Sequence, residues 1–220
     1  MLRLKKKLRS GLPFGQSALL LALTSCNPFS IKDVSVQSQI PVQEDLAVSL
    51  VRMNVANPSD DGTLLVQTDG VTINLPFSGL VGPHEKLKPD EYVGRAIVVK
   101  NAKNVTIKQG FFVGFKIAIY AENAPGLTIE NCAVANNYRQ HLKSTPEKEH
   151  TDDWLWGHEN DKDEWLLYGA GIYLKNCDNV TIKNCRARDG QNGICIVKCD
   201  NATIIDNDMS SSMMLLLLGS

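Results

Sequence analysis

The sequence predicts an all-β solenoid built from coils of 22 residues, and two observations carry that prediction. A Val-Thr-Ile segment starts at Val105 and its variant starts at Leu127, 22 residues later. The same pair of segments starts at Val180 and at Ala202, again 22 residues apart. A second short apolar strand precedes each copy by a constant distance. Because both signals repeat with one period, each coil is expected to bury its apolar edge against the next.

The first strand of each coil alternates apolar residues with a period of two, which places successive side chains on opposite faces. One set of isoleucines is expected inside as a single stack, and the residues after them are expected to face outward. The inward set is Ile97, Ile119, Ile172 and Ile194. The outward set is Val98, Tyr120, Tyr173 and Cys195.

A turn and two further strands complete each coil. The turn carries Asn or Gly at one shared position, Asn104, Gly126, Asn179 and Asn201, and these residue types tolerate a left-handed backbone. The Val-Thr-Ile strand follows, and a third strand supplies Phe112, Val134, Ala187 and Met209 to the interior. Three short strands per coil predict an all-β fold: a right-handed parallel β-helix with 22-residue coils and one long loop insertion.

The segments Gly171–Ile182 and Gly193–Ile204 resemble the repeats of a broad right-handed β-helix superfamily. Pectate-lyase-like enzymes and NosD-like periplasmic repeat proteins belong to it, and the likeness covers roughly residues 94–210. Together with the N-terminal segment and the insertion described below, the resemblance leads us to expect an exported protein that binds an acidic polysaccharide under the loop 138–168. If it is an enzyme, the resemblance implies a polysaccharide lyase, a glycoside hydrolase or an epimerase. The alternative is a non-catalytic, NosD-like scaffold or accessory protein at the surface or in the periplasm.

The N-terminus has the order of a targeting segment: a basic stretch, a short apolar run, and a cysteine. Leu23-Thr24-Ser25-Cys26 resembles the bacterial lipobox, which implies that residues 1–25 are a removed signal peptide and that Cys26 carries a lipid. We therefore expect a protein held at the membrane through Cys26, in the periplasm or at the outer membrane. An ordinary secretory signal that happens to contain a cysteine is the alternative.

The remaining organisation follows from where the repeat begins and stops. Residues 26–60 are expected to be a tether and an N-terminal cap, and residues 61–210 the β-helix, interrupted by the insertion 138–168. Residues 211–220 form an atypical tail whose leucines either reflect a truncated chain or cover the open end of the stack. Cys132, Cys177, Cys185 and Cys199 share coil positions in pairs, so they are expected to stack as small buried side chains without disulfides.

Composition excludes some partners. The formal net charge is −1 and 43% of the residues are hydrophobic, which is enough to bury a real core. Because no basic patch is present, we expect no nucleic-acid partner. We also expect a monomer.

The insertion is the stretch least like the repeat, and long loops on a solenoid often carry function. It contains all three tryptophans of the chain. Their flat faces suit sugar rings, so the predicted substrate-binding residues are Tyr120, Tyr173, Trp154, Trp156 and Trp165. The alternative is that the tryptophans attach the insertion to the β-helix and its acidic residues form a solvated surface.

Acidic side chains are dense in the insertion, with eight between Glu147 and Glu164. Oxygen ligands suit a hard cation, so Ca²⁺ is the predicted cofactor if there is one. Its predicted ligands are Asp152, Asp153, Asp161 and Asp163.

Three residues are predicted to be catalytic. In β-helix lyases, which this sequence resembles, a basic residue abstracts a proton from a uronic acid ring, and that resemblance points to Arg186 and Arg188. His158 is a candidate base near neutral pH. The alternatives are an ion pair between coils, such as Arg186 with Asp208, and a solvent-exposed histidine without a role.

Overall fold

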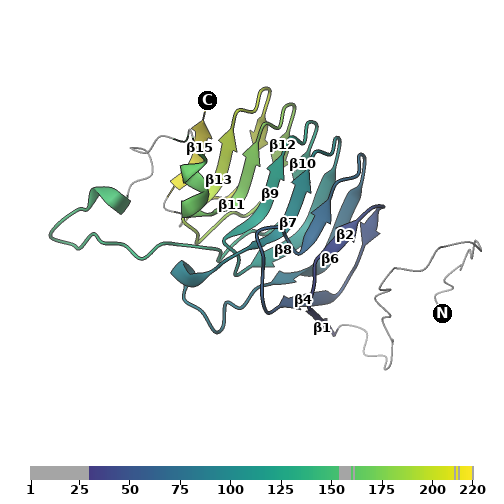
Figure 1. Ribbon diagram of the computed structural model, residues 1–220, viewed down its shortest axis with the longest axis horizontal. Coiled ribbons are helices and arrows are strands. Elements are labelled where there is room, and N and C mark those ends of the chain that lie inside the picture. The colour runs from purple at the N-terminus through teal and green to yellow at the C-terminus, as the bar shows by residue number, and fades with distance from the viewer. Residues whose placement is uncertain (1–29, 154–159, 161, 211, 213, 220) are drawn as a thin grey trace, which may run out of the picture.

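The computed structural model describes residues 30–153, 160, 162–210, 212 and 214–219. The backbone winds into successive parallel coils that form two long sheets, with a long loop leaving the stack at one side (Figure 1). The described residues form strands and three short 3-10 helices: η1 (Pro89–Glu91), η2 (Thr151–Asp153) and η4 (Glu164–Tyr168). No helix among them is long and apolar enough to cross a membrane.

The first sheet contains the Val-Thr-Ile strands. Its strands lie in the order β1-β4-β6-β8-β10-β12-β14, and β3 also pairs with β6. Their bounds are β1 (Lys32–Val36), β3 (Leu46–Ala47), β4 (Val51–Val55), β6 (Thr72–Val81), β8 (Thr106–Val113), β10 (Thr128–Glu130), β12 (Thr181–Lys183) and β14 (Thr203–Ile205).

The second sheet contains the alternating apolar strands that open each coil. Its order is β15-β13-β11-β9-β7-β5-β2, and its pairings are parallel. The bounds are β2 (Ile40–Val42), β5 (Leu64–Val66), β7 (Arg95–Lys100), β9 (Ile117–Glu122), β11 (Ala170–Lys175), β13 (Asn192–Val197) and β15 (Met214–Gly219).

The core is the predicted ladder of aliphatic side chains between the sheets. Ile97, Ile119, Ile172 and Ile194 are in direct register and fully buried. The third strands complete the interior with Phe112, Val134 and Ala187, also buried, while Met209 is partly buried against them. The chain therefore has the predicted all-β, right-handed parallel β-helix fold.

The predicted left-handed corner is confirmed at each position. Asn104, Asn179 and Asn201 have φ of 54°, 56° and 56°, and Gly126 has 74°. The Asn201 side-chain amide donates to Asn179 Oδ1 at 3.3 Å, so the corner forms a ladder of its own. The five cysteines in the described residues are free, and Cys132, Cys177 and Cys185 are buried as small apolar side chains.

Both ends of the stack differ from the prediction. Residues expected to be a tether and cap already form coils, because β1 and β4 pair with each other and β4 pairs with β6. The C-terminal residues 214–219 were expected to break the pattern, yet Ile194 pairs with Leu216 in a further strand at the coil period of 22 residues. These coils escaped prediction because they lack the Val-Thr-Ile signature, although their strands continue the same hydrogen-bonded ladders.

Candidate functional site

The outward column of the second sheet carries the two tyrosines predicted to bind sugar. Their rings stack, with centroids 5.8 Å apart and planes 19° apart. The guanidinium of Arg95 lies 3.9 Å from the Tyr120 ring centroid, a cation–π contact. Burial raises the pKa of Tyr173 to about 12 and raises that of Tyr120 further, with Glu122 adding to the effect at Tyr120. Both tyrosines point away from the aliphatic core, as predicted.

The end of the insertion covers this column. Helix η4 places Trp165 on it, joined by Leu166 and Tyr168, and they form one apolar cluster with both tyrosines. Tyr173 is 0% exposed and Trp165 is 7% exposed. The prediction that these residues offer free platforms for sugar therefore needs correction, because the insertion itself occupies them. Trp154 and Trp156 lie outside the described residues.

One polar contact ties the insertion to the sheet: the ammonium of Lys175 donates to Asp163 Oδ2 at 2.6 Å. Within the insertion, the Trp165 backbone N–H donates to Asn160 Oδ1 at 3.1 Å. These contacts correspond to the sequence alternative in which tryptophans attach the insertion to the β-helix.

The predicted Ca²⁺ ligands are used differently where they are described. The Asp153 carboxylate accepts backbone N–H groups of Lys143 at 3.0 Å and Ser144 at 2.7 Å, together with the Ser144 hydroxyl. The Lys143 N–H contributes most to lowering the pKa of Asp153. Asp161 and the side chain of Asp152 lie outside the described residues. In the described part of the chain, no three Asp, Glu, His or Cys side chains gather to hold a metal, and the Ca²⁺ site stays a prediction.

The two arginines predicted to be catalytic lie on the outer surface of the third strands. Arg188 Nε is 3.6 Å from Asp208 Oδ2, and Arg186 is in bridge register with Asp208. Hydrogen bonds from Ser210 are the first cause of the lowered pKa of Asp208, and both arginines add to it. The ion pair between coils is thus present, with Arg188 rather than Arg186 as the partner. His158 lies outside the described residues, so the predicted catalytic set is not assembled among those described.

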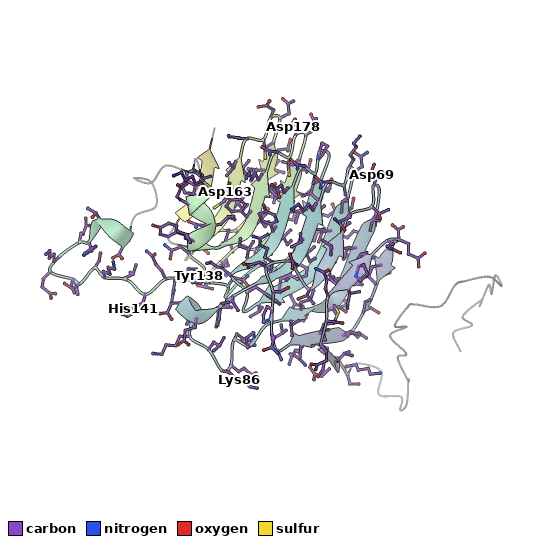
Figure 2. All side chains as sticks on the ribbon, in the orientation of Figure 1. Asp69, Lys86, Tyr138, His141, Asp163 and Asp178 are labelled. Atoms are coloured by element: carbon purple, nitrogen blue, oxygen red, sulfur yellow. The ribbon has the colours of Figure 1, made fainter. Side chains whose placement is uncertain are left out.

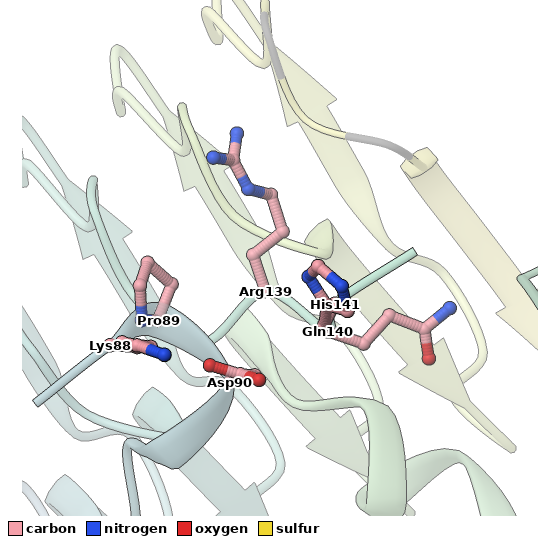
Figure 3. A pocket seen from close by; sticks show the side chains of 6 residues that line it. All are labelled: Lys88, Pro89, Asp90, Arg139, Gln140 and His141. Carbon is pink, nitrogen blue, oxygen red and sulfur yellow. The ribbon is translucent and has the colours of Figure 1, made fainter. Parts of the chain in front are cut away.

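A different surface gathers polar side chains around two adjacent hollows. We call it the loop groove, and it lies between the loop 82–94 and the first residues of the insertion. The hollows have volumes of about 300 and 190 Å³ and share Pro89 and Arg139. In Figure 3, Lys88, Pro89 and Asp90 form one wall and Arg139, Gln140 and His141 the other. The second hollow adds Tyr92, Asn136, Asn137 and Asp189.

One backbone hydrogen bond joins the two walls, from the Arg139 N–H to the Pro89 carbonyl at 3.2 Å. The Gln140 N–H donates to the side chain of Gln191, at Oε1, at 3.1 Å, which ties this wall to the segment before β13. Asn137 is buried beneath the groove and accepts the Phe115 N–H while its amide donates to the Phe112 carbonyl, each at 3.0 Å. The floor of the groove is therefore built from the coil corner, and its walls from two segments that interrupt the repeat.

The groove carries basic, acidic and amide side chains, and most of its charged side chains are exposed. Lys88 and Arg139 supply exposed positive charge and His141 an exposed imidazole, while Asp90 is exposed and Asp189 half-buried. Cations bind carboxylates, and acidic and amide side chains bind hydroxyls. Figure 2 shows Tyr138 and His141 where the insertion leaves the stack, whereas Asp69 and Asp178 lie along another edge.

Apart from His141, a loop histidine that could act as a base, the residues of this groove were not singled out from the sequence. A usable signal was present: the loop 82–94 and the insertion both interrupt the repeat between the third strand of one coil and the first strand of the next. Interruptions at one corner of a solenoid lie along the same edge of the stack, and here only the turn 114–116 of one coil separates them, so the two long loops can meet.

Fold and groove together define a β-helix protein with one elaborated corner. A family model described as "Right handed beta helix region" matches residues 47–218, and the chain belongs to that family. A similar solved structure is described as a "putative glycosyl hydrolase" from Parabacteroides merdae. It has 11% identity and a TM-score of 0.51, and the match covers 80% of this chain and 78% of the other. That likeness is one of fold. No curated protein matches this chain.

Proposed function

We propose that this β-helix protein binds an acidic polysaccharide in the loop groove. The observation that carries the proposal is the convergence of Lys88, Arg139 and His141 with amide side chains in one accessible groove at the elaborated corner. Arg139 and Lys88 suit the carboxylates of uronic acid units, since charge-assisted hydrogen bonds are the strongest available at an accessible surface. Asn136, Asp90 and Asp189 suit the hydroxyls.

The architecture also favours an extended ligand. Neighbouring coils repeat every ~4.8 Å, the spacing of strands in a sheet, which is on the scale of one sugar unit in a chain. A polysaccharide that crosses the groove along the coil axis would therefore advance by about one sugar unit per coil and could contact both walls. The likeness to a structure described as a "putative glycosyl hydrolase" agrees with a role in carbohydrate chemistry.

A second candidate is a non-catalytic scaffold or accessory protein, and one observation favours it. Trp165 lies buried against the sheet and Asp163 is paired with Lys175, which is what a structural insertion would show. Catalysis would instead require an acid and a base to act together in the groove, and Asp90, Asp189 and His141 are the carboxylate and imidazole candidates that line it.

The test uses the chain from Asn27 onward, titrated calorimetrically with polygalacturonate, alginate and neutral dextran. Arg139→Ala is expected to weaken binding of the acidic polymers about tenfold, the loss of one charge-assisted contact of ~1.5 kcal/mol or more. Lys103→Ala removes an exposed cation outside the groove and should bind like the parent.

Two results would contradict the proposal: no binding to either acidic polymer, or equal weakening by Arg139→Ala and Lys103→Ala. Mass spectrometry of the same mixtures decides between binding and catalysis. Unsaturated or shortened oligosaccharides that disappear in Asp189→Asn would assign an activity to the groove, whereas binding without products would support the scaffold.

A further inference from the structure

An exposed apolar stripe, which we call the apolar corner, runs across the first coils. It consists of Ile31, Leu50 and Phe77, the residues directly before Lys32, Val51 and Ser78. Lys32 pairs with Val51, and the Val51 N–H donates to Ser78 Oγ, so the three apolar residues occupy one corner position in successive coils. Ile31 is 44% exposed and Phe77 is 74% exposed, while Leu50 is half-buried.

The backbone at this corner disfavours apolar side chains. Leu50 and Phe77 have φ of 58° and 55°, in the left-handed region. Later coils place polar residues at the same corner in the same conformation, namely Gln109, Asn131, Asn184 and Asp206. Asn and Asp tolerate this conformation, whereas a bulky side chain there is an outlier. Phe77 therefore combines a strained backbone with an exposed ring, a combination that folding alone does not favour.

A bulge brings Phe77 to the surface. Strand β6 runs from Asn74 to Ser78 where its neighbour β8 runs only from Lys108 to Gly110, so β6 has two extra residues at the corner. The coil before it has a corner of the same length, because Ala47 pairs with Asn74 and the Leu50 N–H donates to the Pro76 carbonyl. The early coils thus share an enlarged corner that presents apolar side chains.

The position of the apolar corner in the chain indicates what covers it. Ile31 is five residues from Cys26, the predicted lipid attachment site, and five extended residues span at most ~18 Å. Two basic side chains, Lys32 and Arg52, flank the stripe, with one acidic side chain, Asp33, 3.9 Å from Arg52. The excess of one basic side chain suits anionic headgroups. Sugar recognition favours aromatic faces, whereas two of these three side chains are aliphatic. An apolar stripe with basic flanks is what inserts into the boundary between headgroups and acyl chains.

We propose that the apolar corner is a lipid-surface contact that lays the N-terminal coils against the bilayer. It goes beyond the proposed glycan binding and does not depend on it. The transfer of these exposed apolar side chains from water into the membrane would be favourable, and it takes place when the chain lies against the bilayer. The contact would hold the β-helix in one orientation, which a flexible tether alone cannot do.

The test measures cosedimentation with vesicles of phosphatidylcholine alone and of phosphatidylcholine with phosphatidylglycerol in equal parts. The chain from Asn27 is used, since the described coils begin after it and no lipid is then attached. Phe77→Asn is expected to reduce binding by about tenfold, equivalent to ~1.4 kcal/mol. It should also keep or raise the Tm, because Asn fits the left-handed backbone. Gln109→Asn at the same corner position should leave binding unchanged.

Ile31→Ser provides a second variant at a position without the left-handed backbone, and it should also weaken sedimentation. The proposal is overturned if the parent does not sediment with either vesicle, or if Phe77→Asn sediments as the parent does. A dimer in light scattering that requires Phe77 would assign the corner to a second copy of the chain and would overturn it too. Polysaccharide binding by Phe77→Asn should equal that of the parent. A failure of the membrane-contact proposal is therefore distinguishable from a failure of the proposed polysaccharide binding.

Discussion

The two faces of the second sheet are made by the same strands yet follow different rules. The inner face stacks one residue type in register, with Ile97, Ile119, Ile172 and Ile194 all fully buried. The outer face stacks Val98, Tyr120, Tyr173 and Cys195, and other segments cover it: η4 packs against the tyrosines and Gly62 lies against Val98. The difference teaches that burial on the inner face follows from the repeat, whereas burial on the outer face depends on the segments that pack over it.

The largest expected effect comes from the inner face. Ile172→Ala should lower the free energy of unfolding by ~2–5 kcal/mol, because it leaves a cavity in a ladder whose neighbours cannot close it. Chemical denaturation with circular dichroism measures this. Ile205→Ala is the matched control, since Ile205 is 51% exposed on β14, and its effect should stay within ~0.5 kcal/mol. Equal losses in both variants would contradict the buried ladder.

The outer face should respond locally. Trp165→Ala is expected to lower the free energy of unfolding by ~1–2 kcal/mol. This is less than the ~3–5 kcal/mol expected for an aromatic residue buried in a core, because the insertion can detach without unfolding the coils. Hydrogen exchange should accelerate in residues 162–168 and remain slow in β11. Leu167→Ala in the same turn is the control, because Leu167 is 64% exposed. Faster exchange throughout β11 would show that the outer cover supports the inner ladder.

The smallest effect at neutral pH is expected from Tyr173→Phe. The Tyr173 hydroxyl is buried, with the Asn160 side chain beside it and no hydrogen bond of good geometry among the described residues, so its removal should change stability by less than ~1 kcal/mol. The variant becomes informative in alkali. Burial raises the pKa of Tyr173 to about 12, whereas an unfolded tyrosine titrates near ~10.

Between these pH values the folded chain keeps a proton that the unfolded chain loses, so stability falls as pH rises through this window. Tyr173→Phe should therefore lose less stability than the parent between about pH 10 and 12. Denaturation midpoints across the range measure the difference. Parallel profiles for parent and variant would show that Tyr173 does not carry the effect.

The fold was predictable from residues with a simple local reason. Ile119 and Ile172 belong to an alternating pattern, and Asn179 sits where a left-handed corner is needed, so each reveals its place without a partner. The early coils were missed because Val51–Val55 shares no motif with the later strands and their corners are longer. The cover on Tyr173 was also missed, because the strand pattern distinguishes inside from outside but carries no information on what packs against the outside.

The candidate site was predictable only in part. The insertion was identified as the informative segment, and Arg139, Gln140 and His141 belong to it. The opposite wall, Lys88 to Asp90, was not connected to it, because about 50 residues separate the two walls along the chain. The sequence also directed attention to Arg188, which the structure pairs with Asp208 on another surface.

By itself, the sequence determined the coil period, the inward stack and the left-handed corners, because each depends on short-range periodicity and on the conformational preference of single residues. Only the tertiary structure decided which surfaces remain accessible. Stacking the coils brought the two interruptions together as the loop groove, placed η4 over the tyrosines, and aligned Ile31, Leu50 and Phe77 on one exposed corner. Such juxtapositions arise from contacts between residues distant in the chain, and a one-dimensional pattern does not record them.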